Sequence, residues 1–462
     1  MAETLQNSRL NEELNKKLNK ELNKKLNKEE SPMNTNLENG DLSLLVVQKY
    51  GGSSVATPEK IKNVALRIKN RIQISEQTSE QGEFKMAVVV SAMGKTTDEL
   101  IALAKEVSSA PSPREMDMLL ATGEQVSAAL LAMALQDLGV AATSRNAFQL
   151  GIETTGHHSN ARIRDIDLSL LRRSFEENSV VVITGFQGVT PNGDLTTLGR
   201  GGSDTSAVAI AAKAVSSGLE AVCEIYSDVP GIFTCDPNKV PGARKLDYIT
   251  YAEMLELASL GAKVLHMRSV ELARKYGVTL YCASTFSEER GTYVVKELPE
   301  WMENPVVTGV TVARGQMKFL IKRIRGNGDM LSEIFQALAS AGANLDMIST
   351  AGDDELSFLT LSVMGSDANA VIQAVSGYMK KNGEEGWSIG PGVPVAKVSV
   401  VGDGMNAVTG VAGRVLLALR AKDIAILGIS TSDINISVLV EESQADAAVA
   451  LLAEAFALTD IL

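Results

Sequence analysis

Two glycine-rich segments carry the residues best suited to chemistry on a charged ligand. In the first, Lys49 stands near the end of the apolar run Leu-Leu-Val-Val-Gln-Lys-Tyr and is followed by Gly51, Gly52 and Ser53. Backbone N–H groups of such a loop can hold phosphate oxygens, and one lysine can neutralise their charge. The lysine precedes the glycines, so this is not a Walker A loop. A lysine at the end of a buried strand is costly unless it is paired, which favours a functional role.

The second segment, Thr197–Lys213, is a glycine-rich turn that runs into an alanine-rich helix. Its glycines permit a tight turn and a close approach to a ligand, and we expect Ser203 or Asp204 to cap the helix. A loop that leads into a helix N-terminus suits an anion. Because Arg200 lies inside the loop and Asp204 at its end, a bare phosphate cradle does not account for every residue.

Further segments place polar groups beside predicted strands and helices. Ser91 and Thr97 lie between a strand and a helix, where they serve either as helix caps or as ligand contacts. Glu124 is early in an apolar helix, where a carboxylate either favours the helix dipole or binds a ligand. Phe233, beside an irregular polar loop, either stacks on a base or packs in the core. The remaining candidates are Ser227, Asp228, Asp236 and Lys263.

These loops are separated by an alternation of strand-like and helix-like segments. Residues 86–93 and 180–186 are continuous apolar runs, whereas residues 61–72 and 205–215 repeat apolar residues at helical spacing. This alternation predicts a mainly parallel sheet that is covered by helices on both faces. Ligands of such folds bind at the C-terminal ends of the strands, where these loops lie.

An internal repeat follows the alternating region. Residues 330–350 align without gaps on residues 411–431, and both segments end in Ile-Ser-Thr. Each has a strand before it and a strand and a helix after it, which predicts two copies of a β-α-β-β-α-β unit. The predicted parts are an N-terminal extension at 1–43, a catalytic domain at 44–300, and repeat domains at 301–385 and 386–462.

The extension differs from the rest of the chain because leucine recurs every fourth residue from Leu10 to Leu26. A four-residue repeat drifts by about 40° per step around a helix, which makes a poor coiled-coil seam. A low-complexity, partly helical segment is the favoured interpretation, and a weak oligomerisation helix is the alternative.

Composition and charge narrow the class of protein. The 462 residues allow two to four domains, and 45% hydrophobic with 22% charged residues is typical of a soluble globular protein. We expect no membrane span and no signal peptide, and therefore a cytoplasmic protein. The net charge of −12 argues against general nucleic-acid binding. Cys223, Cys235 and Cys282 are widely spaced, which predicts buried apolar roles and neither a disulfide framework nor a metal site.

Taken together, the loops resemble those of the aspartate kinase family. The matching motifs are Lys49-Tyr-Gly-Gly-Ser, Val90-Ser-Ala-Met-Gly, Thr122-Gly-Glu, Gly185-Phe-Gln-Gly, Leu198-Gly-Arg-Gly-Gly-Ser-Asp, Tyr226-Ser-Asp-Val-Pro-Gly and Gly261-Ala-Lys-Val-Leu-His. The resemblance covers residues 45–290 and extends more loosely through the repeats, which look like ACT-type regulatory domains. It implies a three-layer α/β/α sandwich, the amino-acid kinase fold, followed by two ferredoxin-like α+β domains. The implied reaction is phosphorylation of the L-aspartate side chain by ATP to 4-phospho-L-aspartate, the first step of lysine, threonine and methionine biosynthesis.

The resemblance also implies roles for single residues. Lys49 would neutralise the transferred phosphoryl group, and Asp204 would orient groups at the reacting centre. Glu124 would pair with the substrate ammonium, and Arg200 would pair with the substrate α-carboxylate. The resemblance also implies that Arg200 is a catalytic residue. Further substrate contacts are implied for Ser91, Thr97 and Ser203. ATP contacts are implied for Lys49, Gly51, Gly52, Ser53, Ser227, Asp228, Phe233, Asp236 and Lys263.

ATP is expected as its Mg²⁺ complex, with no metal site built from the protein. The family usually has an arginine after Asp236-Pro237, where this chain has Asn238 followed by Lys239. Either Lys239 takes over a phosphate contact, or that contact is weaker here.

The repeats imply feedback control by lysine, threonine or both, with Asp329, Asn344 and Asp346 as the effector residues. The second repeat has Ala425 where the first has Asn344, so the effector and the number of sites stay open. The resemblance further implies a homo-oligomer, and Met302 is a candidate internal start for a shorter subunit.

Two alternatives remain. One is a kinase for another small amino acid such as glutamate, and the other is a catalytically silent amino-acid sensor. Acetylglutamate is disfavoured as a substrate because it lacks an ammonium for Glu124. The presence of Lys49, Arg200 and Asp204 disfavours a silent sensor.

Overall fold

The computed structural model describes residues 44–78, 85–262, 264–303, 305–324, 328–352 and 357–460. Three of the expectations above fall outside this set. They concern the N-terminal extension, Lys263 and the side chain of Asp329.

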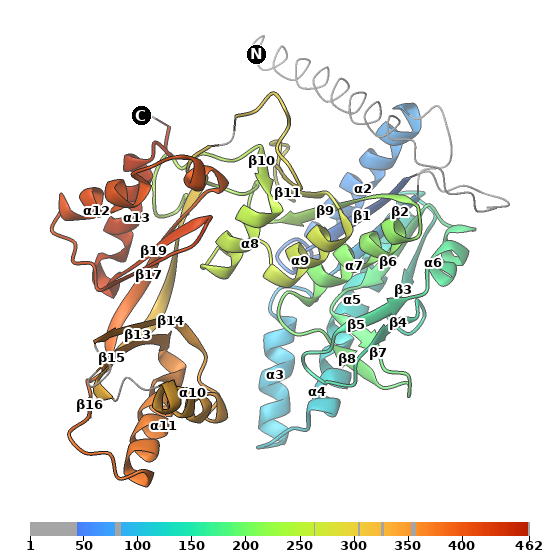
Figure 1. Cartoon of the computed structure of the whole chain (residues 1–462). Helices are drawn as coiled ribbons and strands as arrows, with labels where there is room; N and C mark the ends of the chain where they lie inside the picture. Colours follow the sequence, from blue (N-terminus) through green and yellow to red (C-terminus); the bar gives the residue numbers. More distant parts are fainter. Residues whose placement is uncertain are drawn as a thin grey trace. The chain divides into compact units, whose positions relative to one another are not determined.

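An eight-stranded sheet forms the centre of the first part of the chain (Figure 1). Its strands, in spatial order, are β10 (Tyr248–Thr250), β12 (Thr292–Val295), β11 (Leu280–Ser284), β9 (Glu220–Ser227), β1 (Leu44–Tyr50), β2 (Lys85–Val90), β6 (Val180–Thr184) and β3 (Ala142–Arg145). From β11 to β3 all neighbours are parallel, and β12 is antiparallel to β11. The C-terminal ends of β1, β2, β6 and β9 therefore meet at one edge.

Helices cover both faces of this sheet. Helices α2 (Pro58–Thr78) and α5 (Thr122–Asp137) pack on one face, and α7 (Gly202–Ser216), α8 (Tyr251–Ser259) and α9 (Met267–Tyr276) pack on the other. Successive residues of a strand point to opposite faces, and the sheet has two cores for this reason. The predicted three-layer α/β/α sandwich is confirmed.

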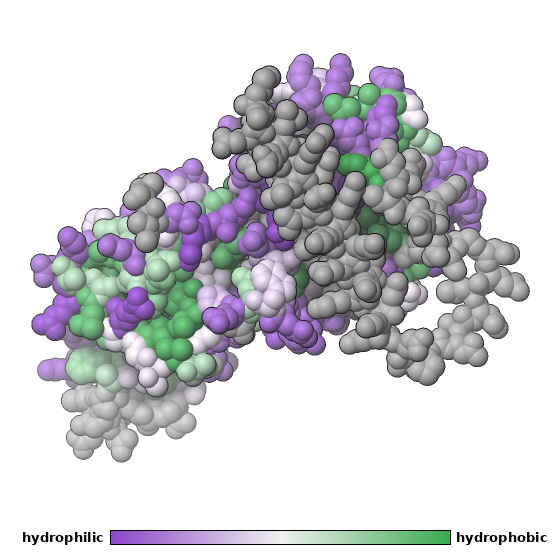
Figure 2. Space-filling model, turned by 90° about the horizontal axis from the view of Figure 1, so that it is seen from above, coloured by the Kyte–Doolittle hydropathy of each residue, from purple (hydrophilic) through white to green (hydrophobic). Residues whose placement is uncertain are grey.

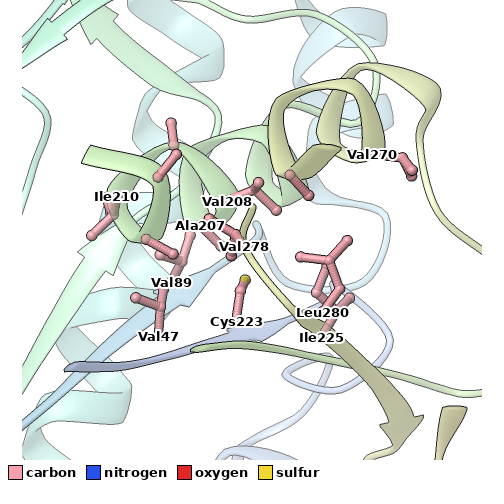
Figure 3. Packing of buried hydrophobic residues seen from close by; sticks show 14 of the residues in the cluster. Val47, Val89, Ala207, Val208, Ile210, Cys223, Ile225, Val270, Val278 and Leu280 are labelled. Atoms are coloured by element: carbon pink, nitrogen blue, oxygen red, sulfur yellow. The ribbon is translucent and has the colours of Figure 1, made fainter. Parts of the chain in front are cut away.

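The core beneath α7 is continuous and apolar. Figure 3 shows Val47, Val89, Cys223 and Ile225 of the strands close to Val208 and its neighbours on α7, and all are buried. The three cysteines are buried and unpaired, as the sequence predicted.

A small sheet flanks the glycine-rich segment that precedes α7. Its strands, in order, are β5 (Ile163–Ile166), β4 (Ile152–Thr154), β7 (Gln187–Val189) and β8 (Leu195–Thr197). The remaining helices of this part of the chain are α3 (Thr96–Val107), α4 (Pro113–Leu120) and α6 (Leu168–Phe175).

The repeats share a seven-stranded sheet. Its main path is β14 (Leu345–Gly352), β15 (Ser357–Met364), β13 (Gly309–Ile324), β17 (Val393–Val401), β19 (Asn435–Glu441) and β18 (Gly428–Thr431), and β16 (Ser388–Ile389) pairs with β13. The helices are α10 (Gly328–Ser340), α11 (Ala368–Lys381), α12 (Val411–Arg420) and α13 (Ala445–Ala455). Helices α10 and α11 pack in one core, and α12 and α13 pack in another.

Strand β13 serves both repeats. Residues 316–324 pair with β15 of the first repeat, whereas residues 309–313 pair with residues 397–401 of β17 in the second. The register shifts between Ala313 and Gln316, where the strand passes from one repeat to the other. The second repeat thus takes its fourth strand from residues 309–313, which lie inside the range 301–385 predicted for the first repeat domain. The simple tandem order did not anticipate this exchange.

One stretch, residues 113–137, is long and apolar enough to cross a membrane by length and composition alone, contrary to expectation. It is divided into α4 and α5, and half of the apolar window is buried in the fold, as in a core helix. On the face shown in Figure 2, hydrophilic residues surround smaller hydrophobic areas.

Candidate active site

A lysine and an aspartate form an ion pair where β1 meets α7. The Lys49 ammonium nitrogen lies 2.6 Å from Asp204 Oδ1, and the side chains are only 11% and 13% exposed. Lys49 comes from the C-terminal end of β1, and Asp204 from the first turn of α7. Two glycine-rich loops that lie about 150 residues apart in the chain are thereby joined at one point. The charge of the nearly buried lysine is balanced by Asp204.

The glycines after Lys49 permit close backbone packing. Gly51 donates its N–H to the Tyr226 carbonyl of β9, and Gly52 accepts from Gly94 N–H in the β2–α3 loop. A Cβ on Gly52 would lie 2.8 Å from the Ala92 carbonyl oxygen, so a side chain there would displace the neighbouring loop. The loop after β1 is therefore joined both to the end of β9 and to the loop after β2, and together they form one connected surface.

Beside this surface, one carboxylate oxygen of Glu124 is left open, meaning that it has no hydrogen-bond partner although it is buried. Glu124 lies in the first turn of α5 and is 3% exposed. Its Oε1 accepts the Ala92 N–H at 3.1 Å, but Oε2 is buried without a hydrogen-bond partner. Burial raises the pKa of the Glu124 carboxyl to about 7, although hydrogen bonds from backbone N–H groups oppose the shift. A buried oxygen without a partner is costly and suits a ligand that donates a hydrogen bond.

The second glycine-rich segment holds Arg200 in a tight turn. Gly199 and Gly201 have positive φ angles of 77° and 69°, and a Cβ on Gly201 would lie 2.3 Å from the His266 ring. Gly201 itself is the N-cap of α7, with no side-chain cap, so the expectation that Ser203 or Asp204 caps the helix is wrong. Asp204 is used in the ion pair instead. Among the described residues, no ion-pair or hydrogen-bond partner of the Arg200 guanidinium is found, and its side chain is exposed.

The predicted hydroxyl contacts lie close to the same edge. Ser91 follows β2 and donates its N–H to the Tyr50 carbonyl, and Ser203 is buried against Gly185. Thr97 is in the first turn of α3, whose N-cap is Lys95 without a side-chain cap. Neither Ser91 nor Thr97 therefore caps this helix, and the helix-cap alternative is removed for both.

The ends of β1 and β9 form a second polar group. Ser227 ends β9, and its carbonyl accepts the Thr285 N–H, while Asp228 is exposed. The Ser53 carbonyl accepts a hydrogen bond from Lys60, whose ammonium lies 4.7 Å from the centre of the exposed Phe286 ring. Sequence analysis missed Lys60 and Phe286, because neither belongs to a recognisable motif.

The loop after Phe233 does not join this group. Cys235 and Val240 pack in the core of the second repeat. Asp236 accepts hydrogen bonds from the backbone and side chain of Asn238. The Lys239 ammonium lies 3.7 Å from a carboxylate oxygen of Asp446 on α13. In the described part of the chain, no hydrogen bond or ion pair joins Asp236 or Lys239 to the Lys49 loop. Phe233 is partly buried and forms a β-bridge with Lys245.

The predicted effector residues lie in a polar group of the repeat sheet. Asp346 of β14 accepts hydrogen bonds from Lys397 of β17 at 2.5 Å and from Gln316 of β13 at 2.6 Å. Lys397 is 7% exposed and Asp346 30% exposed. Asn344 is exposed, and its backbone N–H binds Asp367. Sequence analysis missed Lys397, because its partner lies 51 residues away on a strand of the other repeat.

Comparison with known proteins identifies the family. Residues 45–284 match the model of the amino acid kinase family, and residues 398–456 match an ACT domain. The chain is 44% identical to aspartokinase 2 of Bacillus subtilis over 415 residues, which cover 90% of this chain and 98% of that protein. It is 44% identical to the aspartokinase of Geobacillus stearothermophilus over 417 residues, with coverage of 90% and 98%.

Solved structures share the fold. Escherichia coli aspartokinase III in complex with aspartate and ADP superposes with a TM-score of 0.70 at 24% identity, covering 89% of this chain and 99% of that chain. Aspartate kinase from Clostridium acetobutylicum gives a TM-score of 0.71 at 21% identity, with coverage of 89% and 100%. The sequence relatives and the shared architecture lead to one conclusion: the chain belongs to the aspartokinase family.

Proposed function

We propose that the chain transfers the γ-phosphoryl group of ATP to the side-chain carboxylate of L-aspartate. The observation that carries this proposal is the buried Glu124 carboxylate with one open oxygen, at the same sheet edge as the Lys49–Asp204 ion pair. An amino-acid ammonium would supply the missing hydrogen bond to Glu124. The family supplies the identity of the amino acid, because its members at 44% identity are named aspartokinases.

In this mechanism the substrate carboxylate is the nucleophile. A carboxylate is ionised at neutral pH, so its oxygen attacks the γ-phosphorus without a general base. The new O–P bond forms as the bond from phosphorus to the β–γ bridging oxygen breaks, and ADP leaves with that electron pair. The main barrier is the approach of two anions in line, so positioning and positive charge provide most of the catalysis.

Each residue of the ion pair has a role in this step. Lys49 would neutralise charge on the transferring phosphoryl group, and the N–H group of Gly52 would hold a phosphate oxygen. The Gly51 N–H is already donated to the Tyr226 carbonyl, so Gly51 would contribute only the close approach of its backbone. Asp204 holds the lysine in place at 2.6 Å before the substrates enter and orients groups at the reacting centre. The exposed guanidinium of Arg200 would bind the substrate α-carboxylate in a planar, two-point contact.

ATP would enter as its Mg²⁺ complex. The described residues contain no group of three or more His, Cys, Asp or Glu that could hold a metal ion. The cation would be held mainly by phosphate oxygens and water, and would reduce the charge of the phosphates. The hydroxyl and backbone groups near Ser53 and Ser227 are the proposed nucleotide contacts, with Asp228 beside them. Phe233 and Asp236 stay predictions without a structural contact that supports them.

The repeats are proposed to bind an end-product amino acid, lysine or threonine, and to regulate the kinase. Support comes from the ACT match and from E. coli aspartokinase III, which has been solved in complex with lysine and aspartate. Asn344 and Asp346 are the proposed contacts. Regulation requires that the effector binds one state of the enzyme more tightly than the other.

We also propose that the protein acts in the cytoplasm as a homo-oligomer. Exposed apolar residues on the strands of the repeat sheet, among them Ile348, Phe358 and Ile429, offer surface for self-association. Translation from Met302 would add a short subunit made of the repeats. Mass analysis of the purified protein tests this point, because a sample with only full-length chains would exclude the short subunit.

The reaction is tested by trapping the acyl phosphate with hydroxylamine. Aspartate, ATP and Mg²⁺ should yield aspartyl hydroxamate, whereas glutamate should yield much less. Lysine and threonine, added singly and together, should lower the rate if the repeats regulate the kinase. A product with glutamate alone would support the alternative kinase, and no hydroxamate with any amino acid would support a silent sensor.

A further inference from the structure

A fully buried carboxylate lies behind the glycine-rich segment that carries Arg200. Asp117 is on α4, is 0% exposed, and uses both of its oxygens. His158 Nδ1 lies 2.8 Å from Oδ2, Thr197 Oγ1 donates to Oδ1 at 2.6 Å, and the Ser159 N–H contacts both oxygens at 3.0 and 2.9 Å. Because no oxygen is left open, Asp117 is not suited to bind substrate itself.

The partners of Asp117 belong to two segments that also bind each other. His158 and Ser159 lie in the β4–β5 connection, and Thr197 ends β8 immediately before the glycine-rich turn. The Ala161 N–H donates to the Thr197 carbonyl at 2.9 Å. A Cβ on Gly199 would lie 3.0 Å from the Ser159 carbonyl oxygen, so the two backbones are in close contact.

Arg268 of α9 joins the same two segments. Its guanidinium donates to the Leu198 carbonyl at 2.8 Å and to the Ala161 carbonyl at 2.7 Å. The segment before Arg200 is thus held by a carboxylate from α4 and by a guanidinium from α9. Each side chain binds both segments, so neither segment can move without breaking contacts to both.

The backbone of Ser159 indicates how strongly this arrangement is imposed. Its φ angle is +64°, in the left-handed region that a residue with a side chain rarely adopts. Such a conformation persists only where the surroundings determine it, and here the Ser159 N–H is bound by both Asp117 oxygens.

We propose that Asp117 is a positioning residue that fixes Arg200 for the substrate α-carboxylate. Arg200 follows Thr197 by three residues, and no partner of its own side chain is found in the described part of the chain, so its place depends on its backbone. A two-point contact with a carboxylate tolerates little displacement. This inference rests on the proposed function.

Helix α4, which carries Asp117, is followed directly by α5, which carries Glu124, the residue proposed to bind the substrate ammonium. The Ala121 N–H donates to the Asp117 carbonyl, and Glu124 follows in the first turn of α5. Gln187 of β7 also donates to the Ala121 carbonyl at 2.6 Å. Asp117 therefore sets the glycine-rich turn relative to Glu124, which fixes the separation between the carboxylate site and the ammonium site.

The test is Asp117→Asn, which keeps the shape but replaces one acceptor oxygen by a donor. The KM for aspartate should rise about 10- to 100-fold, while the KM for ATP should change less than about twofold. The matched control is Glu224→Gln, another buried carboxylate, which binds Gln48, Arg71 and Tyr226 and is not bonded to either segment. Both variants alter a buried carboxylate, so the melting temperature should fall in both. The KM for aspartate should not change in Glu224→Gln.

Two further variants keep the test decisive if Asp117→Asn does not fold. Thr197→Val removes one donor to Asp117 and should raise the aspartate KM about threefold to tenfold without an effect on the ATP KM. In an Arg200→Ala background, Thr197→Val or Asp117→Asn should have almost no further effect on the aspartate KM.

Equal changes in both KM values, or full additivity with Arg200→Ala, would overturn the positioning role. An unchanged aspartate KM in Thr197→Val would overturn it too. Failure of the proposed function looks different, since the unaltered protein would then give no aspartyl hydroxamate at all.

Discussion

The kinase region and the repeat region each contain an acidic residue proposed to bind an amino acid. The two residues differ in whether their carboxylate oxygens already have hydrogen-bond partners. In the kinase region, Glu124 is buried and keeps Oε2 without a partner. In the repeats, both oxygens of Asp346 are already bound, one by the Lys397 ammonium and the other by the Gln316 amide.

This difference has a thermodynamic consequence. A ligand ammonium that binds Glu124 adds a hydrogen bond where none existed, so the site is prepared for the substrate. A ligand ammonium that binds Asp346 must compete with Lys397, so the net gain is small and depends on what happens to that lysine. The first arrangement favours binding, and the second favours an exchange of partners between two states of the protein.

Lys49→Ala should have the largest effect, and it should abolish the kinase reaction without changing the repeats. Without its ammonium the transferring phosphoryl group loses the positive charge proposed to neutralise it, and kcat should fall about 10³-fold or more. Effector binding, measured by calorimetry, should be unchanged. Lys213→Ala, which removes a lysine paired with Asp165 at the surface, is the control. Normal turnover in Lys49→Ala would remove Lys49 from the catalytic role.

Glu124→Gln should separate binding from stability. The amide keeps an acceptor for the Ala92 N–H but loses the negative charge for the substrate ammonium, so the KM for aspartate should rise about 100-fold. Because the folded-state pKa is raised, the charged Glu124 destabilises the free protein above pH 7. At pH 8 the variant should therefore melt at a higher temperature than the unaltered protein. Glu99→Gln, an exposed acid in the first turn of α3, serves as control, and a lower melting temperature for Glu124→Gln would contradict the open-oxygen interpretation.

The pH dependence of aspartate use should show the same carboxyl group. Below about pH 7 Glu124 is protonated in the free enzyme and cannot pair with an ammonium. The kcat/KM for aspartate should therefore fall by up to about tenfold per pH unit below 7 and level off above it. The affinity for ATP should not follow this curve, and the step should disappear in Glu124→Gln. The same step in that variant would assign it to another group.

The sequence predicted the sheet and its active edge because both depend on local patterns. Continuous apolar runs alternate with helical periodicity, and Lys49 and Asp204 each stand in a glycine-rich loop with its own signal. That the two form an ion pair follows from the adjacency of β1 and α7, which the local pattern does not fix. Only the resemblance to a family indicated that the loops of Lys49 and Asp204 meet at one reacting centre.

Other features depend on pairing across long distances, which no local pattern contains. The division of β13 between the two repeats is set by its register with β15 and β17. The loop of Asp236 and Lys239, for which nucleotide contacts stay a prediction, is held by the packing of Cys235 and Val240 in the second repeat's core, which its motif did not indicate. Asp117 gave no signal at all, because its partners lie 41 to 80 residues further along the chain.

Lys397→Gln should have the smallest effect on catalysis, and it should change the binding of an effector to the repeats. The variant leaves Asp346 without its ammonium partner, so an effector ammonium no longer competes with Lys397. The affinity for lysine should increase about fivefold to tenfold if its ammonium binds Asp346, while kcat without effector stays the same. Lys318→Gln is the matched control, since Lys318 lies on β13 and donates to the Leu427 carbonyl instead of a carboxylate. If calorimetry gives the same lysine affinity in both variants, the effector ammonium does not bind Asp346, and Asn344 is then the contact to test next.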